Sequence, residues 1–275
     1  MVHRFFFSVL LLACPLGLGG QEFWECDDCC QGYSRVYLGP QVYHTTLSIK
    51  NTDSTIGGVL GLENEDTHPS GTMYGVNGGY EYKKPWSLYA NVDLNYGQGK
   101  LKHHDALTRY VHEYDVAAVV GYQVGGAECD VWSFTPYVGL GYLRQSHNLT
   151  SFHVTYRYSI VQLPIGIKAD YAFCALCSDW TVGLNVAVIP QIDSKVKINL
   201  LQGAYWSLAK RTDWLVSLPI EYFCNCYPLS VKLDLFWKKV GFGGSKAVTP
   251  SGLALGLPPM KWNAYGASLD LVWEF

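Results

Sequence analysis

The sequence has few charged residues and no long apolar run. Only 16% of its residues are Asp, Glu, Lys or Arg, and 20 basic side chains nearly balance 23 acidic ones. A chain so close to neutral offers no general attraction for a polyanion, so we expect no nucleic-acid partner. The apolar run from Phe5 to Ala13 is well short of the roughly 20 residues that a helix needs to cross a bilayer. We therefore expect no membrane-spanning helix.

The N-terminal residues have the order of an export signal. A short basic start containing Arg4 precedes the apolar run, and the small residues Gly17 to Gly20 follow it. We interpret residues 1–20 as a signal peptide that is cleaved after Gly19 or Gly20. The residues Leu11 to Cys14 also resemble the lipobox of bacterial lipoproteins, although Pro15 fits that motif poorly. Processing as a lipoprotein is the alternative.

Aromatic residues are abundant where charges are scarce. The chain contains 20 Tyr and 9 Trp, more than a water-soluble protein of this size usually carries. Their rings favour a membrane-water interface, because the ring sits at the hydrocarbon boundary while the OH or NH group stays hydrated. The composition therefore points to the surface of a membrane.

Alternation of apolar and polar residues predicts β-strands. Between Trp86 and Tyr96 the apolar side chains fall on every second position, so one face of a strand is apolar and the other is polar. The same pattern recurs in residues 74–82, 114–122, 180–188, and 231–237. It slips by one residue between Ile160 and Val161, where we expect a bulge that keeps both halves facing lipid. The segment from Tyr33 to Ile49 alternates too poorly for its faces to be assigned.

The connections between these segments alternate in length. Short ones are expected near residues 83–85, 125–130, 174–179, and 224–228. Longer ones are expected over residues 51–71, 97–109, 200–213, and 241–259, with a shorter one at 148–151. Short turns on one side and long loops on the other are typical of transmembrane barrels. We predict an all-β fold, a closed antiparallel transmembrane β-barrel of about ten strands over residues 33–275, with eight or twelve strands as alternatives.

The last strand carries the most specific pattern. Alternate residues from Tyr265 through Leu271 and Trp273 to Phe275 share one apolar face, and the chain ends at the phenylalanine. This resembles the terminal-strand signature of Gram-negative outer-membrane barrels of the small OmpA, OmpX and omptin size class. The resemblance implies insertion into the outer membrane, contact with its lipid, and recognition by the barrel-assembly machinery. It does not identify a subfamily.

Eight cysteines follow the signal, each before the first strand or in an expected short turn. They are Cys26, Cys29, Cys30, Cys129, Cys174, Cys177, Cys224, and Cys226. In a barrel whose short turns face the periplasm, all eight would lie where thiols form disulfides. Residues 21–32 would form a periplasmic cysteine-rich segment. The alternatives are local disulfides, cross-links to other cysteine-rich envelope proteins as a resemblance to those of chlamydiae implies, and a zinc site at Cys174, Cys177, Cys224 and Cys226, which an oxidising compartment disfavours.

Ionisable residues on the predicted polar faces are expected to line the interior. They are Glu81, Asp93, Asp115, Arg157, Lys168, Asp170, Glu221, Lys232, Asp234, and Asp270. Most should pair with one another inside a filled barrel, because unpaired charge there is costly. The alternative is a narrow water path that favours cations, since acidic groups are in excess.

No set of residues makes a convincing catalytic site. His103, His104 and Asp105 lie in an expected outer loop, where a histidine beside a carboxylate could act as a general base. The Asp-x-His pattern that a resemblance to omptin proteases would require is missing. We therefore expect no enzyme activity, no cofactor and no metal, and a structural or surface-interaction role. A small pore is the second hypothesis and an outer-membrane hydrolase the third.

Overall fold

The computed structural model describes residues 33–49, 68–103, 107–126, 131–149, 154–175, 178–199, 205–224, 228–248 and 254–275. Their strands are β1 (Tyr33–Ile49), β2 (Ser70–Lys83), β3 (Leu88–His103), β4 (Leu107–Tyr122), β5 (Val124–Gly125), β6 (Trp132–Leu149), β7 (Val154–Gln162), β8 (Ile165–Ala175), β9 (Ser178–Ile198), β10 (Tyr205–Ser207), β11 (Thr212–Cys224), β12 (Leu229–Phe242), β13 (Ser245–Val248), β14 (Ala254–Leu257) and β15 (Met260–Glu274). Among the described residues, no helix is long and apolar enough to cross a membrane.

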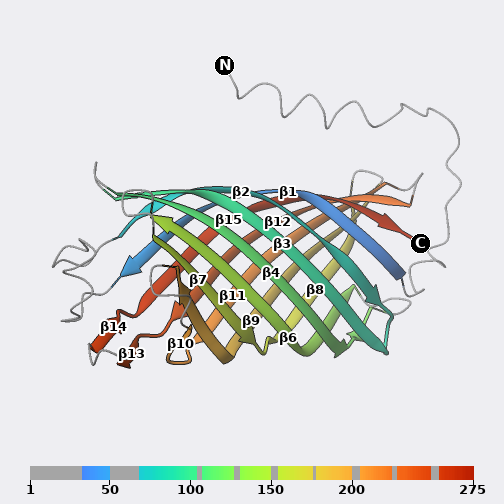
Figure 1. Ribbon diagram of the computed structural model, residues 1–275. Helices are drawn as coiled ribbons and strands as arrows, with labels where there is room; N and C mark the ends of the chain where they lie inside the picture. Colours follow the sequence, from blue (N-terminus) through green and yellow to red (C-terminus); the bar gives the residue numbers. More distant parts are fainter. Residues whose placement is uncertain are drawn as a thin grey trace, which may run out of the picture.

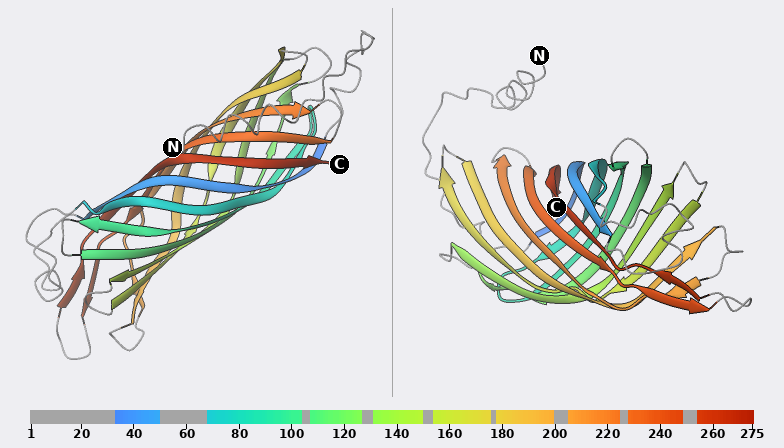
Figure 2. Two further views of the ribbon diagram at one scale, coloured as in Figure 1. Left: turned by 90° about the horizontal axis from the view of Figure 1, so that it is seen from above. Right: turned by 90° about the vertical axis from the view of Figure 1, so that its left-hand side faces the viewer.

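Ten strand positions close into one antiparallel barrel (Figure 1). Each barrel strand pairs with its neighbours in the sequence, and β15 pairs with β1, so the sheet has no free edge. Strands β7 and β8 occupy a single position between β6 and β9. Figure 2 shows the strands running obliquely around the barrel, with the C-terminus beside the start of β1. The predicted fold class and strand number are confirmed.

The two ends of the barrel differ as the sequence predicts. Short connections and the starts of β1, β3, β6, β9 and β12 lie at one end, which we name the turn end. The opposite end, the loop end, carries three long connections, which follow β1, β9 and β12, and two short ones, between β3 and β4 and between β6 and β7. Three loop predictions are wrong in extent, and one of them, the segment 200–213, contains β10 paired with β9. Strands β3 and β4 remain paired up to His103 and Leu107, inside the segment 97–109, and the segment 241–259 contains the hairpin of β13 and β14. The pairing of β3 with β4 continues this far because Leu101 still has an apolar interior to pack against.

Each long strand changes polarity along its length. In the part of β3 near the turn end, Val92 and Leu94 face outward and Asp93 faces the interior. Nearer the loop end, Lys100 faces outward and Leu101 is fully buried inside. We name these two parts the membrane zone and the loop-end zone. The first has the apolar exterior that lipid requires, and the second has the polar exterior and apolar core of a water-soluble barrel.

Strand β7 shows why one sequence expectation fails. Val154, Tyr156, Tyr158 and Ile160 are buried in the interior, whereas they were expected to face lipid. The even-numbered positions continue inward through β8, so the chain makes no slip; the interior simply changes from apolar to polar. A register irregularity does lie next to the expected place, between Val161 and Gln162, but the unpaired residue is Ile192 on β9.

Strand β1 alternates poorly in sequence for the same reason. Its outward face runs from apolar Leu38 and Val42 to polar Thr46, and its inward face runs from polar Arg35 to apolar Leu47. Because the two faces of β1 change polarity in opposite directions, neither face is more apolar than the other when the whole strand is considered. The strand nevertheless has a regular inside and outside along its whole length.

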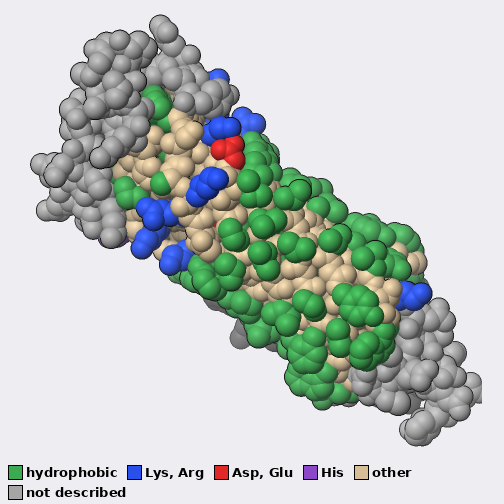
Figure 3. Space-filling model, turned by 90° about the horizontal axis from the view of Figure 1, so that it is seen from below, with side chains coloured by type: hydrophobic (Ala, Val, Ile, Leu, Met, Phe, Trp, Pro, Cys, Tyr) green, Lys and Arg blue, Asp and Glu red, His purple; other side chains and the backbone are tan. Residues whose placement is uncertain are grey.

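Exposed aromatic side chains mark both edges of the membrane zone. Towards the loop end they are Tyr74, Tyr114, Tyr142, Trp214, Trp237, and Tyr265. Towards the turn end they are Trp86, Tyr122, Trp132, Phe134, Trp273, and Phe275. Between them the outside is apolar, and Figure 3 shows this hydrophobic band on one face of the barrel. Two such girdles around an apolar band are the exterior expected of a transmembrane barrel.

Candidate functional site

A charged chamber fills the turn-end half of the barrel. Its volume is about 740 Å³, and its lining runs from Tyr33, Lys83 and Pro85 at the turn end to Gln162 and Lys238 near the middle. Nine carboxylate residues and five Lys or Arg residues line it. The chamber therefore has the excess of acidic groups that the sequence suggests.

The structure places nearly all the predicted lumen residues around this chamber. Those that line it are Glu81, Asp93, Asp115, Lys168, Asp170, Glu221, Lys232, and Asp234. Asp270 is fully buried in the wall and pairs with Lys232. Arg157 is a correction: it is exposed between the buried Tyr156 and Tyr158, so it points away from the interior. The rule that polar side chains face the interior misassigns Arg157, because β7 lies in the loop-end zone, where the interior is apolar.

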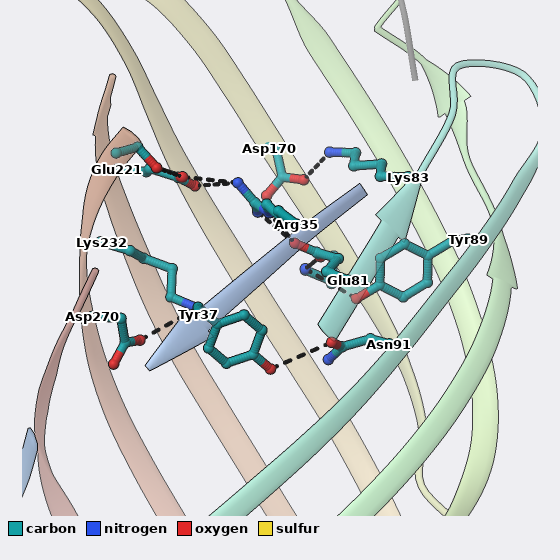
Figure 4. A network of polar contacts seen from close by, with 12 residues as sticks. Arg35, Tyr37, Glu81, Lys83, Tyr89, Asn91, Asp170, Glu221, Lys232 and Asp270 are labelled. Carbon is teal, nitrogen blue, oxygen red and sulfur yellow. Dashed lines mark hydrogen bonds and ion pairs between the residues drawn. The ribbon is translucent and has the colours of Figure 1, made fainter. Parts of the chain in front are cut away.

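Arg35 lies at the centre of the main polar network (Figure 4). Its Nη1 donates to both carboxylate oxygens of Glu221 at 2.8 and 2.7 Å, and its Nε donates to Oε2 of Glu81 at 2.7 Å. Lys168 approaches the other oxygen of Glu81 at 2.5 Å. All four groups are largely shielded from solvent. Two cations and two carboxylates thus compensate one another across β1, β2, β8 and β11.

Further pairs extend this network along the wall. Lys83 contacts Asp170 at 2.6 Å. Lys232 lies 3.4 Å from Asp270 and 3.9 Å from the ring centroid of Tyr37. The hydroxyl of Tyr37 in turn donates to Asp93. Lys83 and Asp170 join β2 to β8 across the lumen, whereas Lys232 and Asp270 are cross-strand partners on the adjacent strands β12 and β15, so the network braces the chamber wall both across the lumen and along it.

A second network lies deeper in the barrel. Lys238 contacts Asp115 at 2.5 Å and Glu113 at 3.2 Å. Gln145 donates to Glu113 at 2.5 Å and lies 3.0 Å from His147, which contacts Arg109 at 3.1 Å. These side chains carry polar contacts from the chamber into the loop-end zone.

An apolar layer closes the barrel beyond the chamber. Nine of the ten strand positions each contribute a side chain with 0% exposure: Leu47, Met73, Leu101, Val111, Leu143, Ile160, Val196, Val240, and Trp262. All nine belong to one contiguous cluster. The tenth position, β11, contributes the fully buried Asp213, which accepts hydrogen bonds from Gln162 at 2.7 Å, Gln191 and the Gly241 amide. Among the described residues, these buried side chains thus form a packed layer between the chamber and the loop end.

Sequence reasoning misses several members of these networks. Arg35 and Tyr37 lie in the strand whose faces could not be assigned, and Glu113 is not among the ionisable residues expected to line the interior. His112 instead faces outward and contacts the Tyr96 hydroxyl. If the alternation of apolar and polar residues is read separately in the membrane zone and in the loop-end zone, Arg35 falls on the inward face.

Other predicted sites fall partly outside the described part of the chain. The side chains of His103, His104 and Asp105 lie outside it. So do Cys26, Cys29, Cys30, Cys129, Cys177 and Cys226. The backbones of Cys174 and Cys224 lie at the turn end, in register with Asp179 and Leu229. The assembly-signal residues Tyr265, Leu271, Trp273 and Phe275 are exposed on the outer face, as predicted.

No family model matches the sequence, and a search of the curated proteins finds no match. Solved structures do match. The outer membrane protease OmpT from Escherichia coli is 9% identical, with a TM-score of 0.55, over 90% of this chain and 98% of that one. The transport unit of the E. coli autotransporter AIDA-I is 13% identical, with a TM-score of 0.45, over 98% and 97%. Neisserial surface protein A is 10% identical, with a TM-score of 0.36, over 87% and 97%.

The likeness to OmpT concerns the fold, since the identity is too low to carry an activity. Together with the closed ten-strand barrel and its aromatic girdles, it defines the class: the chain is an outer-membrane-type β-barrel. Its particular role within that class has to be inferred from the chamber, the apolar layer and the surface.

Proposed function

We propose that this protein is a non-conducting outer-membrane barrel with a structural or surface-interaction role. In the proposed orientation, the turn end faces the periplasm and the loop end faces the outside of the cell, as in other barrels with short periplasmic turns. The observation that carries the proposal is the apolar layer. Nine fully buried side chains from nine strand positions separate the chamber from the loop end.

This arrangement suits a platform better than a pore. The barrel rises beyond the membrane zone, so the connections at the loop end are held on a rigid, well-packed support. The chamber ends below the apolar layer and therefore serves as a braced cavity. Binding surfaces on loops are commonly positioned by scaffolds of this type.

Planar-bilayer recording tests the proposal. The purified, folded protein should give no stable conductance steps. The variant Leu101→Ala/Leu143→Ala/Trp262→Ala removes side chains from the apolar layer and should give steps if it still migrates as a folded barrel before boiling. A matched variant, Val92→Ala/Leu94→Ala/Leu140→Ala, changes outward residues and should remain silent. Stable steps from the unmodified protein would overturn the non-conducting assignment.

A small cation-selective pore is the second candidate. The excess of carboxylates in the chamber favours it, and it would require a displacement of the apolar layer. Steps from the unmodified protein that carry more K⁺ than Cl⁻ would support this candidate over the first.

An enzyme is the third candidate. Its test is a lipid or peptide hydrolysis assay on the folded protein and on a His103→Ala/His104→Ala variant. We expect no turnover by either form. Turnover that disappears in the variant would make the protein a hydrolase.

We further propose that the cysteines act at the periplasmic rim and that the terminal strand is read by the barrel-assembly machinery. Under non-reducing conditions we expect species of higher mass that contain cysteine-rich envelope partners. Replacing Cys26, Cys29 and Cys30 should reduce them more than replacing Cys174 and Cys177, because the first group precedes the barrel while the second lies in a hairpin. Strong labelling of Cys174 or Cys224 by an impermeant thiol reagent on intact cells would contradict this orientation.

A further inference from the structure

Four cationic side chains gather on the outside of β6, β7 and β9. We name Arg144, Arg157, Lys195 and Lys197 the basic cluster. They form two rows across the strands: Arg144 and Lys195 flank Ser159, and Arg157 lies between Ser146 and Lys197. Arg144, Arg157 and Lys195 are exposed and Lys197 is half-buried. In Figure 3, Lys and Arg side chains likewise lie beyond the hydrophobic band, near the loop end of the face shown.

The rows begin where the membrane zone ends. On β6 the outward residues Leu140 and Tyr142 are apolar and aromatic, and the next outward residue is Arg144. On β9 the exposed Ile192 is followed by Lys195. On β7 the outward Val161 is followed by Ser159 and Arg157. The basic cluster therefore lies directly at the level that lipid headgroups occupy.

Cations face each other within the basic cluster. Arg157 and Lys197 are directly opposite each other on adjacent strands, and like charges in that position repel. The nearby carboxylate of Asp193 contacts Lys195 at 2.7 Å. Within the described ranges, neither Arg144 nor Arg157 forms an ion pair. A bound anion would supply the two guanidinium groups of Arg144 and Arg157 with acceptors.

We propose that the basic cluster binds the phosphate groups of a lipid in the outer leaflet. Guanidinium groups recognise phosphate through paired hydrogen bonds, and the hydroxyls of Ser146 and Ser159 lie between the cations as further donors. The apolar surface beneath, at Leu140 and Val161, would hold the acyl chains of the same molecule. A lipid fits the basic cluster and the apolar surface at once, whereas free phosphate fits the basic cluster alone.

Native mass spectrometry on the folded full chain in neutral detergent tests this site. The protein is titrated with bis-phosphorylated lipid A, with phosphatidylcholine as the zwitterionic control. The Arg144→Gln/Arg157→Gln variant should bind lipid A about thirtyfold more weakly, since each cation near a charged headgroup contributes a factor of about five. The matched variant Lys239→Gln/Lys261→Gln, on the outside of β12 and β15, should bind within about twofold of the unmodified protein.

Three results would overturn the proposal. One is unchanged affinity in Arg144→Gln/Arg157→Gln, and another is an equal loss in Lys239→Gln/Lys261→Gln, which would indicate a diffuse charge effect. The third is displacement of lipid A by inorganic phosphate at an equal concentration, which would assign the site to a free anion. Migration before and after boiling verifies that each variant is a folded barrel, so a folding failure is recognised separately.

Discussion

The membrane zone and the loop-end zone are built from the same strands with opposite polarity. In the membrane zone the outside is apolar and the interior holds ion pairs around Arg35. In the loop-end zone the outside carries Lys and Arg, and the interior is packed with side chains such as Leu47 and Trp262. The solvent outside each segment of a strand therefore decides which face of that segment is apolar. A single strand continues from the membrane zone into the loop-end zone without a break.

Breaking the buried ion pairs of the membrane zone should lower the free energy of unfolding more than any other single substitution proposed for this barrel. Replacing Arg35 with Met leaves Glu81 and Glu221 without their shared cation, and breaking a buried pair in this way costs about 3 to 5 kcal/mol. The free energy of unfolding, from denaturant titration in lipid vesicles, should fall by that amount. The fourfold variant Arg35→Met/Lys168→Met/Glu81→Gln/Glu221→Gln should recover more than half of the loss. If it is no more stable than Arg35→Met, the network does not act as a compensated unit.

A core substitution in the loop-end zone should cost nearly as much. Leu143→Ala opens a cavity in the apolar layer and should lower the free energy of unfolding by about 2 to 5 kcal/mol. Leu140→Ala on the same strand, where the side chain is exposed to lipid, should cost less than about 1 kcal/mol. The same denaturant titration measures both. Equal losses would mean that Leu143 does not pack in a closed layer.

Charge on the outer face should distinguish the zones on a single strand. Leu269→Arg in the middle of the lipid-facing band should cost about 2 to 4 kcal/mol, and Asn263→Arg beyond the band should cost at most about 1 kcal/mol. Both residues face outward from β15. A similar cost at the two positions would place the membrane boundary elsewhere.

The smallest expected effect concerns Arg157. Because it points outward and is exposed, Arg157→Gln should change the free energy of unfolding by less than about 0.5 kcal/mol. A loss of several kcal/mol would instead show a buried, paired role in the interior.

The sequence predicts the membrane zone well and the loop-end zone poorly. The strands at residues 86–96 and 263–275 can be read because most of each lies in lipid, where one rule of alternation applies. Residues 33–49 and 154–162 cannot, because each spans or lies within the zone of reversed polarity. That reversal explains both the missed Arg35 and the misplaced Arg157.

The sequence does not predict which residues pair with each other within the polar networks. Arg35 and Glu221 are 186 residues apart in sequence, and their contact depends on the number of strands and on the tilt of the barrel. Alternation shows which side of a strand a residue faces. It carries no information about which residue meets it across the lumen.

In the proposed non-conducting barrel, the chamber opens towards the turn end alone. In a cysteine-free background, Asn95→Cys places a thiol in the chamber and Lys100→Cys places one on the outside of β3 in the loop-end zone. An impermeant thiol reagent on intact cells should label Lys100→Cys rapidly and leave Asn95→Cys unlabelled until the outer membrane is breached. Equally rapid labelling of Asn95→Cys on intact cells would show an open path through the apolar layer and contradict the account.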